Sequence, residues 1–170
     1  MGLLPGAPAA PAPLRVLGAA VDWAIVAMGA AIVVVVFANV VLHQLALDIA
    51  WTTEFGELVM VWTTFLGAAA AVRRQAHMAV GELVELLPAP LRLWADAAIQ
   101  LVVAGVLVLL VWKGWIAVQS SWENILTVLD WPMAVQYLSL PAGSAIALAF
   151  VAWDLTLIAR GMPREARYGS

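Results

Sequence analysis

The chain has 170 residues, of which 65% are hydrophobic and 11% are charged, and its mean hydropathy is +0.98. Soluble domains are about 45–50% apolar and about 25% charged, so this composition excludes an ordinary soluble protein. The net charge of −3 and the lack of a basic cluster argue against nucleic-acid binding, which depends on Lys and Arg. Because cysteine is absent, disulfides, thiolate nucleophiles and cysteine-bound metals are excluded as well.

Four stretches are apolar over lengths close to the ~20 residues that cross a hydrocarbon core of ~30 Å. In chain order they run from about Val16 to Leu42, Leu58 to Val72, Leu93 to Val118 and Leu138 to Ala159. They predict an all-α integral membrane protein with four transmembrane helices, in a single membrane domain over residues 15–160. Residues 1–14, rich in Pro and Ala, are expected to form a flexible cytoplasmic tail, and residues 161–170 a cytoplasmic C-terminal tail.

The first stretch has an alternative interpretation as a signal peptide, because Arg15 precedes it. Its uninterrupted apolar run from Trp23 to Leu42 is longer than an ordinary signal-peptide core, and no small-residue cleavage site is clear before His43. The length of the run favours a retained transmembrane helix.

The cations predict the orientation of the chain in the membrane. Seven of the eight Lys and Arg residues flank the same ends of the predicted helices: Arg15, Arg73, Arg74, Arg92, Arg160, Arg164 and Arg167. The exception, Lys113, lies near the other end of the third helix, where its stem could reach outward. Because cytoplasmic segments are enriched in Lys and Arg, both termini are predicted to be cytoplasmic.

The segment between the second and third predicted helices also has helical periodicity. Its apolar residues fall on one face, with Glu82 and Glu85 beside them: Val80, Leu83, Val84 and Leu87. The pattern ends at Pro88 and predicts a cytoplasmic amphipathic helix that lies flat on the membrane surface.

Sites for chemistry are poorly represented. The two histidines fall on opposite membrane faces, and neither has further ligands at metal-binding spacing, so no metal, cofactor or enzymatic activity is expected. Asp22, Asp96 and Asp154 each lie a turn or two inside the cytoplasmic end of a predicted helix. Their position favours local pairing, such as Arg92 with Asp96, over an ion pathway, which would place a carboxylate nearer the membrane centre.

The second apolar stretch indicates contact with protein. At ~22 Å it is too short for the membrane core, so either the helix extends toward Trp51 or the bilayer thins there. An extended helix brings Glu57 and Glu54 to the membrane edge, where they either face protein or form a solvated helix N-terminus. The small residues from Gly67 to Ala71 predict a helix–helix interface, within the chain or with a second subunit.

No polar site at the membrane centre and no broken pair of helices is evident, which favours an accessory subunit over a complete transporter. Landmark residues recur along Trp51–Pro88 at a family-specific spacing: Trp51, Glu54, Val61, Trp62, Phe65 to Ala69, Arg73, Arg74, His77 and Val80. In these residues the chain resembles the small, DctQ-like membrane subunit of tripartite ATP-independent periplasmic (TRAP) transporters. Residues 126–143 are similar to the stretch that precedes the last helix in that family.

The resemblance implies a scaffold subunit in the bacterial inner membrane that pairs with a large multi-span transporter subunit and with a periplasmic substrate-binding protein. Such transporters are secondary carriers, driven by an ion gradient, with sodium suggested by the family, and import organic anions such as carboxylates. We therefore predict that Glu54, Trp62 and Gly67 lie at the partner interface. Arg73, Arg74 and Arg92 are predicted to contact the phosphates of membrane lipids.

Two alternatives remain at this stage. The small subunit of a tripartite tricarboxylate transporter also has four spans, but the block from Glu54 to His77 argues against it. A self-contained four-span exporter would need a carboxylate well inside a span, for which Asp22 is the only candidate in the first helix.

Overall fold

A computed structural model of the chain describes residues 10–45, 47, 50–74 and 88–162. The helices are α1 (Ala12–Gln44), α2 (Thr52–Arg73), α4 (Ala89–Ser120), α5 (Ala134–Tyr137) and α6 (Ser139–Ala159). Within these ranges there is no strand, only an isolated antiparallel bridge between Ile125 and Pro132. Among these described residues, four spans are long and apolar enough to cross a membrane, the last of them formed by α5 and α6 together. The predicted all-α protein with four membrane helices is therefore confirmed.

Two helix boundaries differ from the sequence-based estimates. Helix α1 begins at Ala12, inside the stretch assigned to the tail, because Pro13 sits in the first turn, where a missing N–H costs nothing. Helix α2 begins at Thr52, next to Trp51, and has 22 residues. At 1.5 Å per residue the helix is about 33 Å long, which is enough to cross the membrane core. Of the two alternatives for the short apolar stretch, extension toward Trp51 is therefore the one that the structure shows.

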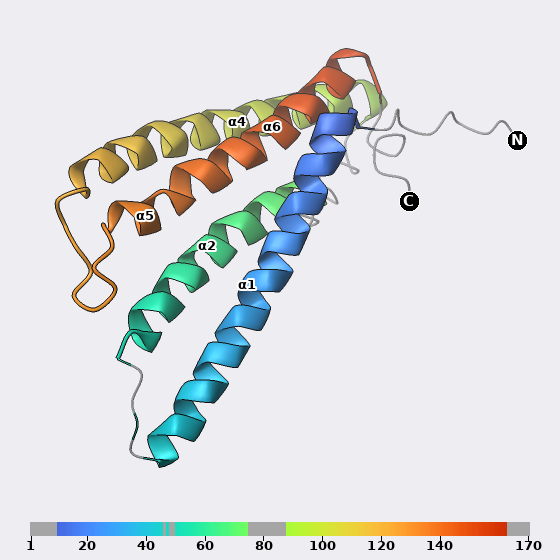
Figure 1. The fold of residues 1–170 in the computed structure, drawn as a ribbon. Coiled ribbons are helices and arrows are strands. Elements are labelled where there is room, and N and C mark those ends of the chain that lie inside the picture. The colour runs from blue at the N-terminus through green and yellow to red at the C-terminus, as the bar shows by residue number, and fades with distance from the viewer. Residues whose placement is uncertain (1–9, 46, 48–49, 75–87, 163–170) are drawn as a thin grey trace, which may run out of the picture.

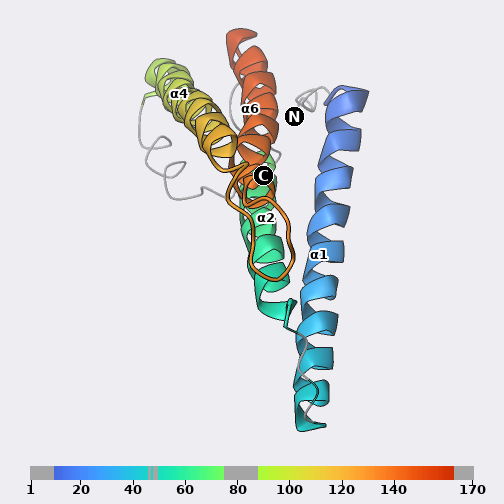
Figure 2. The same ribbon diagram turned by 60° about the vertical axis from the view of Figure 1, so that its left-hand side comes forward.

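The long helices run in alternating directions; their ends approach one another on one side and fan apart on the other (Figure 1). We call the group with Ala12, Arg73, Ala89 and Ala159 the terminal end, and the opposite group the loop end. Helix α2 packs against α1 and α6, and α6 packs against α4. Figure 2 shows α1 on the opposite side of α2 from α4. The helices α2 and α6 are thus central, and α1 and α4 flank them.

Small residues form the contacts between the central helices. Ala69 of α2 is fully buried against Ala147 and Val151 of α6 and Leu107 of α4. On the other side of α2, Ala70 and Leu66 pack with Val21 of α1. The alanines of the small-residue segment therefore pack within the chain, which lets the helix axes approach closely.

Gly143 lies where α6 approaches α2 closely. A Cβ atom at this position would lie 2.7 Å from Cβ of Phe65 and 2.8 Å from its carbonyl oxygen. Backbone cannot move aside as a flexible side chain can, so the packing of α6 on α2 requires glycine here.

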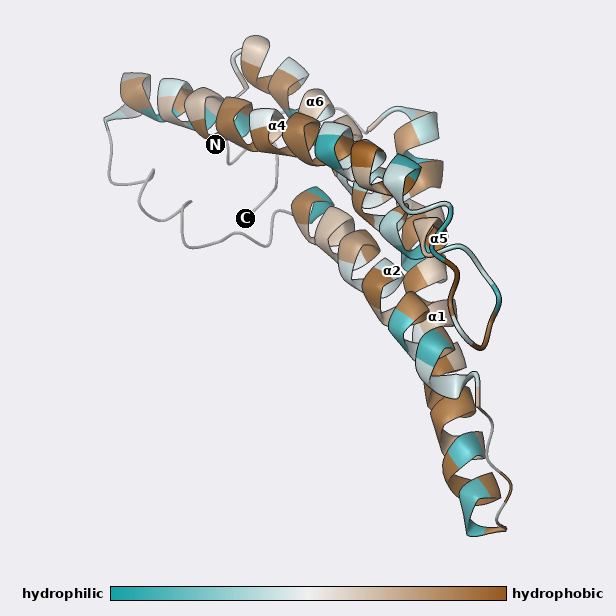
Figure 3. Cartoon of the chain, turned by 90° about the vertical axis from the view of Figure 1, so that its left-hand side faces the viewer, coloured by the Kyte–Doolittle hydropathy of each residue, from teal (hydrophilic) through white to brown (hydrophobic). Residues whose placement is uncertain are grey.

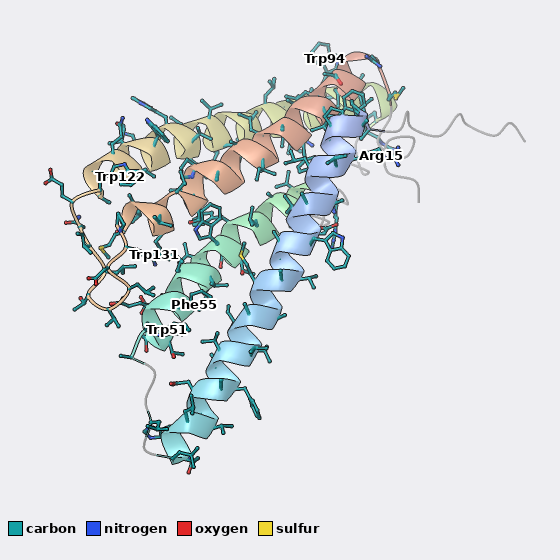
Figure 4. The ribbon with its side chains drawn as sticks, in the orientation of Figure 1. Arg15, Trp51, Phe55, Trp94, Trp122 and Trp131 are labelled. Carbon is teal, nitrogen blue, oxygen red and sulfur yellow. The ribbon has the colours of Figure 1, made fainter. Side chains whose placement is uncertain are left out.

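Hydrophobic side chains cover the outside of the bundle. Figure 3 shows hydrophobic residues predominating along the long helices, with hydrophilic ones mostly near their ends and in the loop that follows α4. Exposed tryptophans mark both ends: Trp94 lies at the terminal end, and Trp51, Trp122 and Trp131 lie at the loop end (Figure 4). Trp94 on α4 and Trp51 at the start of α2, which lie at the ends of membrane helices, match the aromatic belts of membrane proteins.

Several predictions fall outside the described residues. They concern the amphipathic helix with Val80 and Leu87, the two tails beyond residues 10 and 162, and His77. The cytoplasmic location of the termini likewise stays a prediction.

Candidate functional site

Glu54, in the first turn of α2, holds the loop between α4 and α5. The N–H of Val128 donates hydrogen bonds to both carboxylate oxygens, at 3.1 Å to Oε1 and 3.0 Å to Oε2. The N–H of Leu129 donates to Oε2 at 2.8 Å. An ionised carboxylate makes stronger hydrogen bonds than a neutral acceptor, so one side chain fixes two successive peptide groups of the loop. Contact of Glu54 with a second subunit remains a prediction beside this role within the chain.

Trp62 supports the same region from two turns further along α2. Its indole Nε1 donates a hydrogen bond of 3.1 Å to the carbonyl oxygen of Val135 in α5. The ring also packs beside the cluster formed by Val21, Leu66 and Ala70. Trp62 therefore connects the loop end of the chain to the packing between α1 and α2.

Gly67 differs from the alanines that follow it. A Cβ atom built at Gly67 meets no atom within 4 Å, whereas Ala69 and Ala70 are buried against α6 and α1. The face of α2 that carries Gly67 is therefore open within this chain. Open space beside a glycine in a membrane helix is compatible with a partner helix.

Arg73 and Arg74 share one carboxylate at the terminal end. Nη2 of Arg73 lies 2.6 Å from one oxygen of Asp22 in α1, and Nη2 of Arg74 lies 2.9 Å from the other. The Arg74 side chain is 64% exposed, against 26% for Arg73, so only Arg74 keeps much of its surface outside the bundle. The two cations thus tie α1 to α2, while their predicted contact with lipid phosphates stays a prediction.

Arg73 also touches α6. Its Cζ lies 5.9 Å from the ring centroid of Phe150, within the range of a cation–π contact. A Cβ atom at Gly18 of α1 would collide with the Arg73 guanidinium, so the glycine leaves room for the arginine to reach Asp22. One side chain of α2 therefore contacts both α1 and α6.

A second polar group joins α4 to α6 near the same end. Asp96 and Asp154 are both buried, and Nε2 of Gln100 donates a 2.7 Å hydrogen bond to Asp154. Arg92, the third predicted lipid-contacting cation, lies one turn before Asp96 on α4 and is half-buried. These groups sit toward the helix ends and brace neighbouring helices.

The remaining surface offers little chemistry. An apolar groove of about 320 Å³ lies between the terminal ends of α4 and α6, lined by Leu93, Trp94, Ala97, Leu155, Ile158 and Ala159. Without a charged side chain in its lining, it suits an acyl chain better than a polar substrate. Among the described residues, no group of three or more His, Asp or Glu side chains is placed to hold a metal ion.

Sequence reasoning missed the acceptor role of Glu54, the shared partner of Arg73 and Arg74, and Gln100. The pairing of Asp22 with the two arginines had a usable signal, because all three were predicted to lie near the same membrane face. The Glu54 contact had none, since its donors are backbone N–H groups 74 and 75 residues away, which no side-chain pattern marks.

Comparison with known proteins gives two findings. The sequence model of the family described as "Tripartite ATP-independent periplasmic transporters, DctQ component" matches residues 32–161. The chain is also 28% identical over 154 residues to the C4-dicarboxylate TRAP transporter small permease protein DctQ of Vibrio cholerae serotype O1. That alignment covers 74% of this chain and 66% of the relative, so the chain spans slightly less than two thirds of the relative's length.

Proposed function

The chain belongs to the DctQ component family of the tripartite ATP-independent periplasmic transporters, and on that premise we propose that it is a small accessory subunit that scaffolds such a transporter. As a member of this family it is a multi-pass membrane protein and a transporter component. The proposed complex contains a large membrane subunit, which moves the substrate, and a soluble periplasmic binding protein, which delivers it.

The proposal rests on the absence of charged side chains from the centre of each membrane span. Each membrane span has a stretch without Lys, Arg, Asp or Glu that includes its centre: residues 23–44, 58–72, 97–112 and 134–153. In membrane carriers, charged side chains near the membrane centre mark the pathways of ions and of anionic substrates. The charged side chains described above instead hold helices and a loop, which supports a scaffold whose partner provides the transport site.

We assign the terminal end to the cytoplasm and the loop end to the periplasm. Among the described residues, the terminal end carries Arg15, Arg73, Arg74, Arg92 and Arg160, whereas Lys113 is the cation nearest the loop end. This asymmetry supports the assignment through the preference of Lys and Arg for the cytoplasmic side. The same cations, Arg74 above all because it is exposed, are proposed to meet lipid phosphates.

Gly67 provides the test of the partner interface, together with Glu54 and Trp62 on the same helix. A Cβ atom at Gly67 meets no atom within 4 Å, so we expect leucine there to leave the fold of this chain intact but to obstruct a closely packed partner helix. We expect Gly67→Leu to reduce co-purification with the large subunit about tenfold, since a blocked close contact costs about 1–3 kcal/mol. Gly105→Leu is the matched control, because Gly105 on α4 also faces open space. Equal yields of both variants and the unaltered chain would remove Gly67 from the interface.

The proposed substrate is an organic anion, and the coupling is an ion gradient. The Vibrio cholerae relative is named for C4-dicarboxylates, which supports a carboxylate substrate. A thermal-shift screen of the soluble component against carboxylates selects the test compound. We then expect uptake into proteoliposomes that contain all three components, and none when this chain is omitted. Uptake by this chain alone would contradict the proposal and favour a self-contained carrier.

A further inference from the structure

The loop between α4 and α5, which we call the hairpin loop (residues 121–133), has a defined backbone. The N–H of Leu126 donates to the carbonyl oxygen of Trp131 at 2.8 Å, and the N–H of Met133 donates to that of Asn124 at 2.7 Å. These bonds accompany the antiparallel bridge between Ile125 and Pro132. The loop therefore folds back on itself as a small hairpin.

Glu54 supports the tip of this hairpin from outside. Its carboxylate binds the N–H groups of Val128 and Leu129, and Asp130, the next residue, has a φ of 53°. Few residues other than glycine adopt this left-handed conformation, although Asp tolerates it better than most. A tight turn with a strained residue is thus held by a side chain from a different helix.

The hairpin loop exposes an apolar and acidic surface. Ile125 and Val128 are 60% and 43% exposed, and Trp122 and Trp131 are 56% and 47% exposed. Figure 4 shows the two tryptophans at the loop end, where Trp51 and Phe55 at the start of α2 pack edge to face, 5.6 Å apart. Glu123 and Asp130 add two exposed carboxylates, while residues 114–159 contain no Lys, Arg or His.

We propose that the hairpin loop is a preorganised docking element for a soluble protein whose contact surface places cationic side chains around an apolar patch. This inference rests on the proposed function, in which the loop end faces the periplasm and the soluble component carries substrate. Exposed hydrophobic side chains grouped on one surface mark interaction sites, and the carboxylates beside them select a basic partner.

The fixed backbone favours a protein partner over the membrane surface. Partition of an apolar segment into the bilayer interface depends on buried area and needs no particular loop conformation. Recognition of a protein gains from a loop held in its bound shape, because less conformational entropy is lost on binding. Glu54 therefore acts as a positioning residue, which shapes the surface without belonging to it.

The test uses the purified complex of this chain with its large subunit in nanodiscs, and the soluble component of the same transporter as the probe. We expect Glu54→Gln to weaken binding of the soluble component about tenfold. The neutral amide binds the N–H groups of Val128 and Leu129 less strongly, so the hairpin loop no longer keeps the conformation that the partner recognises. Glu57→Gln is the matched control, because Glu57 is exposed one turn further along α2 and should bind within about twofold of the unaltered complex.

Surface variants keep the test independent of loop folding. Ile125→Ser and Val128→Ser should each weaken binding, whereas Glu123→Gln and Asp130→Asn should slow association and reduce its dependence on salt. Asparagine keeps the left-handed conformation accessible at position 130. Unchanged affinity and association rates in all four variants would overturn the proposal.

A membrane location for the loop is a separate contradictory outcome. Because the chain has no cysteine of its own, a thiol-reactive fluorophore labels this chain only at position 125 of the Ile125→Cys variant. We expect no quenching of this fluorophore by brominated lipids and a change in its emission when the soluble component binds; strong quenching without the soluble component would overturn the proposal. Failure of the unaltered chain to form the complex, or of that complex to bind the soluble component, would instead contradict the proposed function.

Discussion

The central helices α2 and α6 differ from the flanking helices α1 and α4 in both hydropathy and burial. The most apolar segments of the spans have mean hydropathies of 1.6 and 1.8 for the central pair, against 2.8 and 2.3 for the flanking pair. Within these most apolar segments, none of the residues is buried in α1, whereas 39% are buried in the span that contains α6. In this chain the least hydrophobic helices are the most buried.

Lipid as solvent explains this inversion. Burying an apolar side chain against another helix gains little when lipid is equally apolar, so helices associate through close packing and polar bonds. The central helices supply these with Ala69, Ala147, Gly143 and the hydrogen bond of Trp62. The flanking helices keep broad apolar faces for lipid or for a partner protein.

The largest expected effect comes from separating the central helices. Gly143→Ala places a methyl group against the backbone of Phe65, and overpacking of this kind costs about 1–3 kcal/mol in free energy of unfolding. Gly67→Ala is the control: it meets open space and should be neutral or stabilise the helix by up to about 1 kcal/mol. Thermal unfolding in detergent, followed by tryptophan fluorescence, compares the two, and equal melting temperatures would argue against the close approach of α6 to α2.

The next effect comes from releasing α1 from the central pair. Arg73→Gln removes the shorter ion pair with Asp22 and the contact with Phe150, so it should lower the melting temperature more than Arg74→Gln. In an Asp22→Asn background the cost of Arg73→Gln should shrink, because the partner is already neutral. A cost that is the same in both backgrounds would show that Arg73 acts without Asp22.

A smaller effect is expected where a central helix supports the loop end. Trp62→Phe keeps most of the ring but removes the donor to Val135, at a cost of about 0.5–1.5 kcal/mol. Hydrogen exchange should become faster across α5 in this variant. Trp115→Phe, at an exposed position on α4, should leave the exchange of α5 unchanged. Slow exchange in both variants would mean that the hydrogen bond does not stabilise α5.

The smallest effect is expected on a flanking face. Phe37 on α1 is 69% exposed, so Phe37→Ala should change the stability of the isolated chain by less than about 0.5 kcal/mol. A loss of several kcal/mol in the free energy of unfolding, measured by the same assay, would show that the part of α1 around Phe37 packs against the rest of the chain.

The membrane spans were predictable because each is a long apolar run. A segment of this length and composition in lipid must pair its own backbone N–H and C=O groups, which it does as a helix. The start of α2 was less accessible, since Thr52 and Glu54 are polar and hydropathy alone begins the segment at Leu58. The start of α1 at Ala12 was obscured by prolines that the first helical turn accepts.

The sequence marked Glu54, Trp62, Gly67 and the arginines as candidate site residues, but it did not indicate their contacts within the chain. Asp22 and Arg73 are 51 residues apart, and their contact depends on how α1 crosses α2. The donors to Glu54 are peptide groups, which every residue except proline offers. Long-range geometry of this kind requires the folded chain.

The central claim, that this chain is a scaffold for a larger transporter subunit, is tested most directly by co-expression with that subunit and purification through a tag on this chain alone. Native mass spectrometry of the purified material then gives the composition. We expect a complex that contains both subunits and survives size-exclusion chromatography. Recovery of this chain alone, or only as a homo-oligomer, while the large subunit is present and folded in the same membranes, would contradict the account.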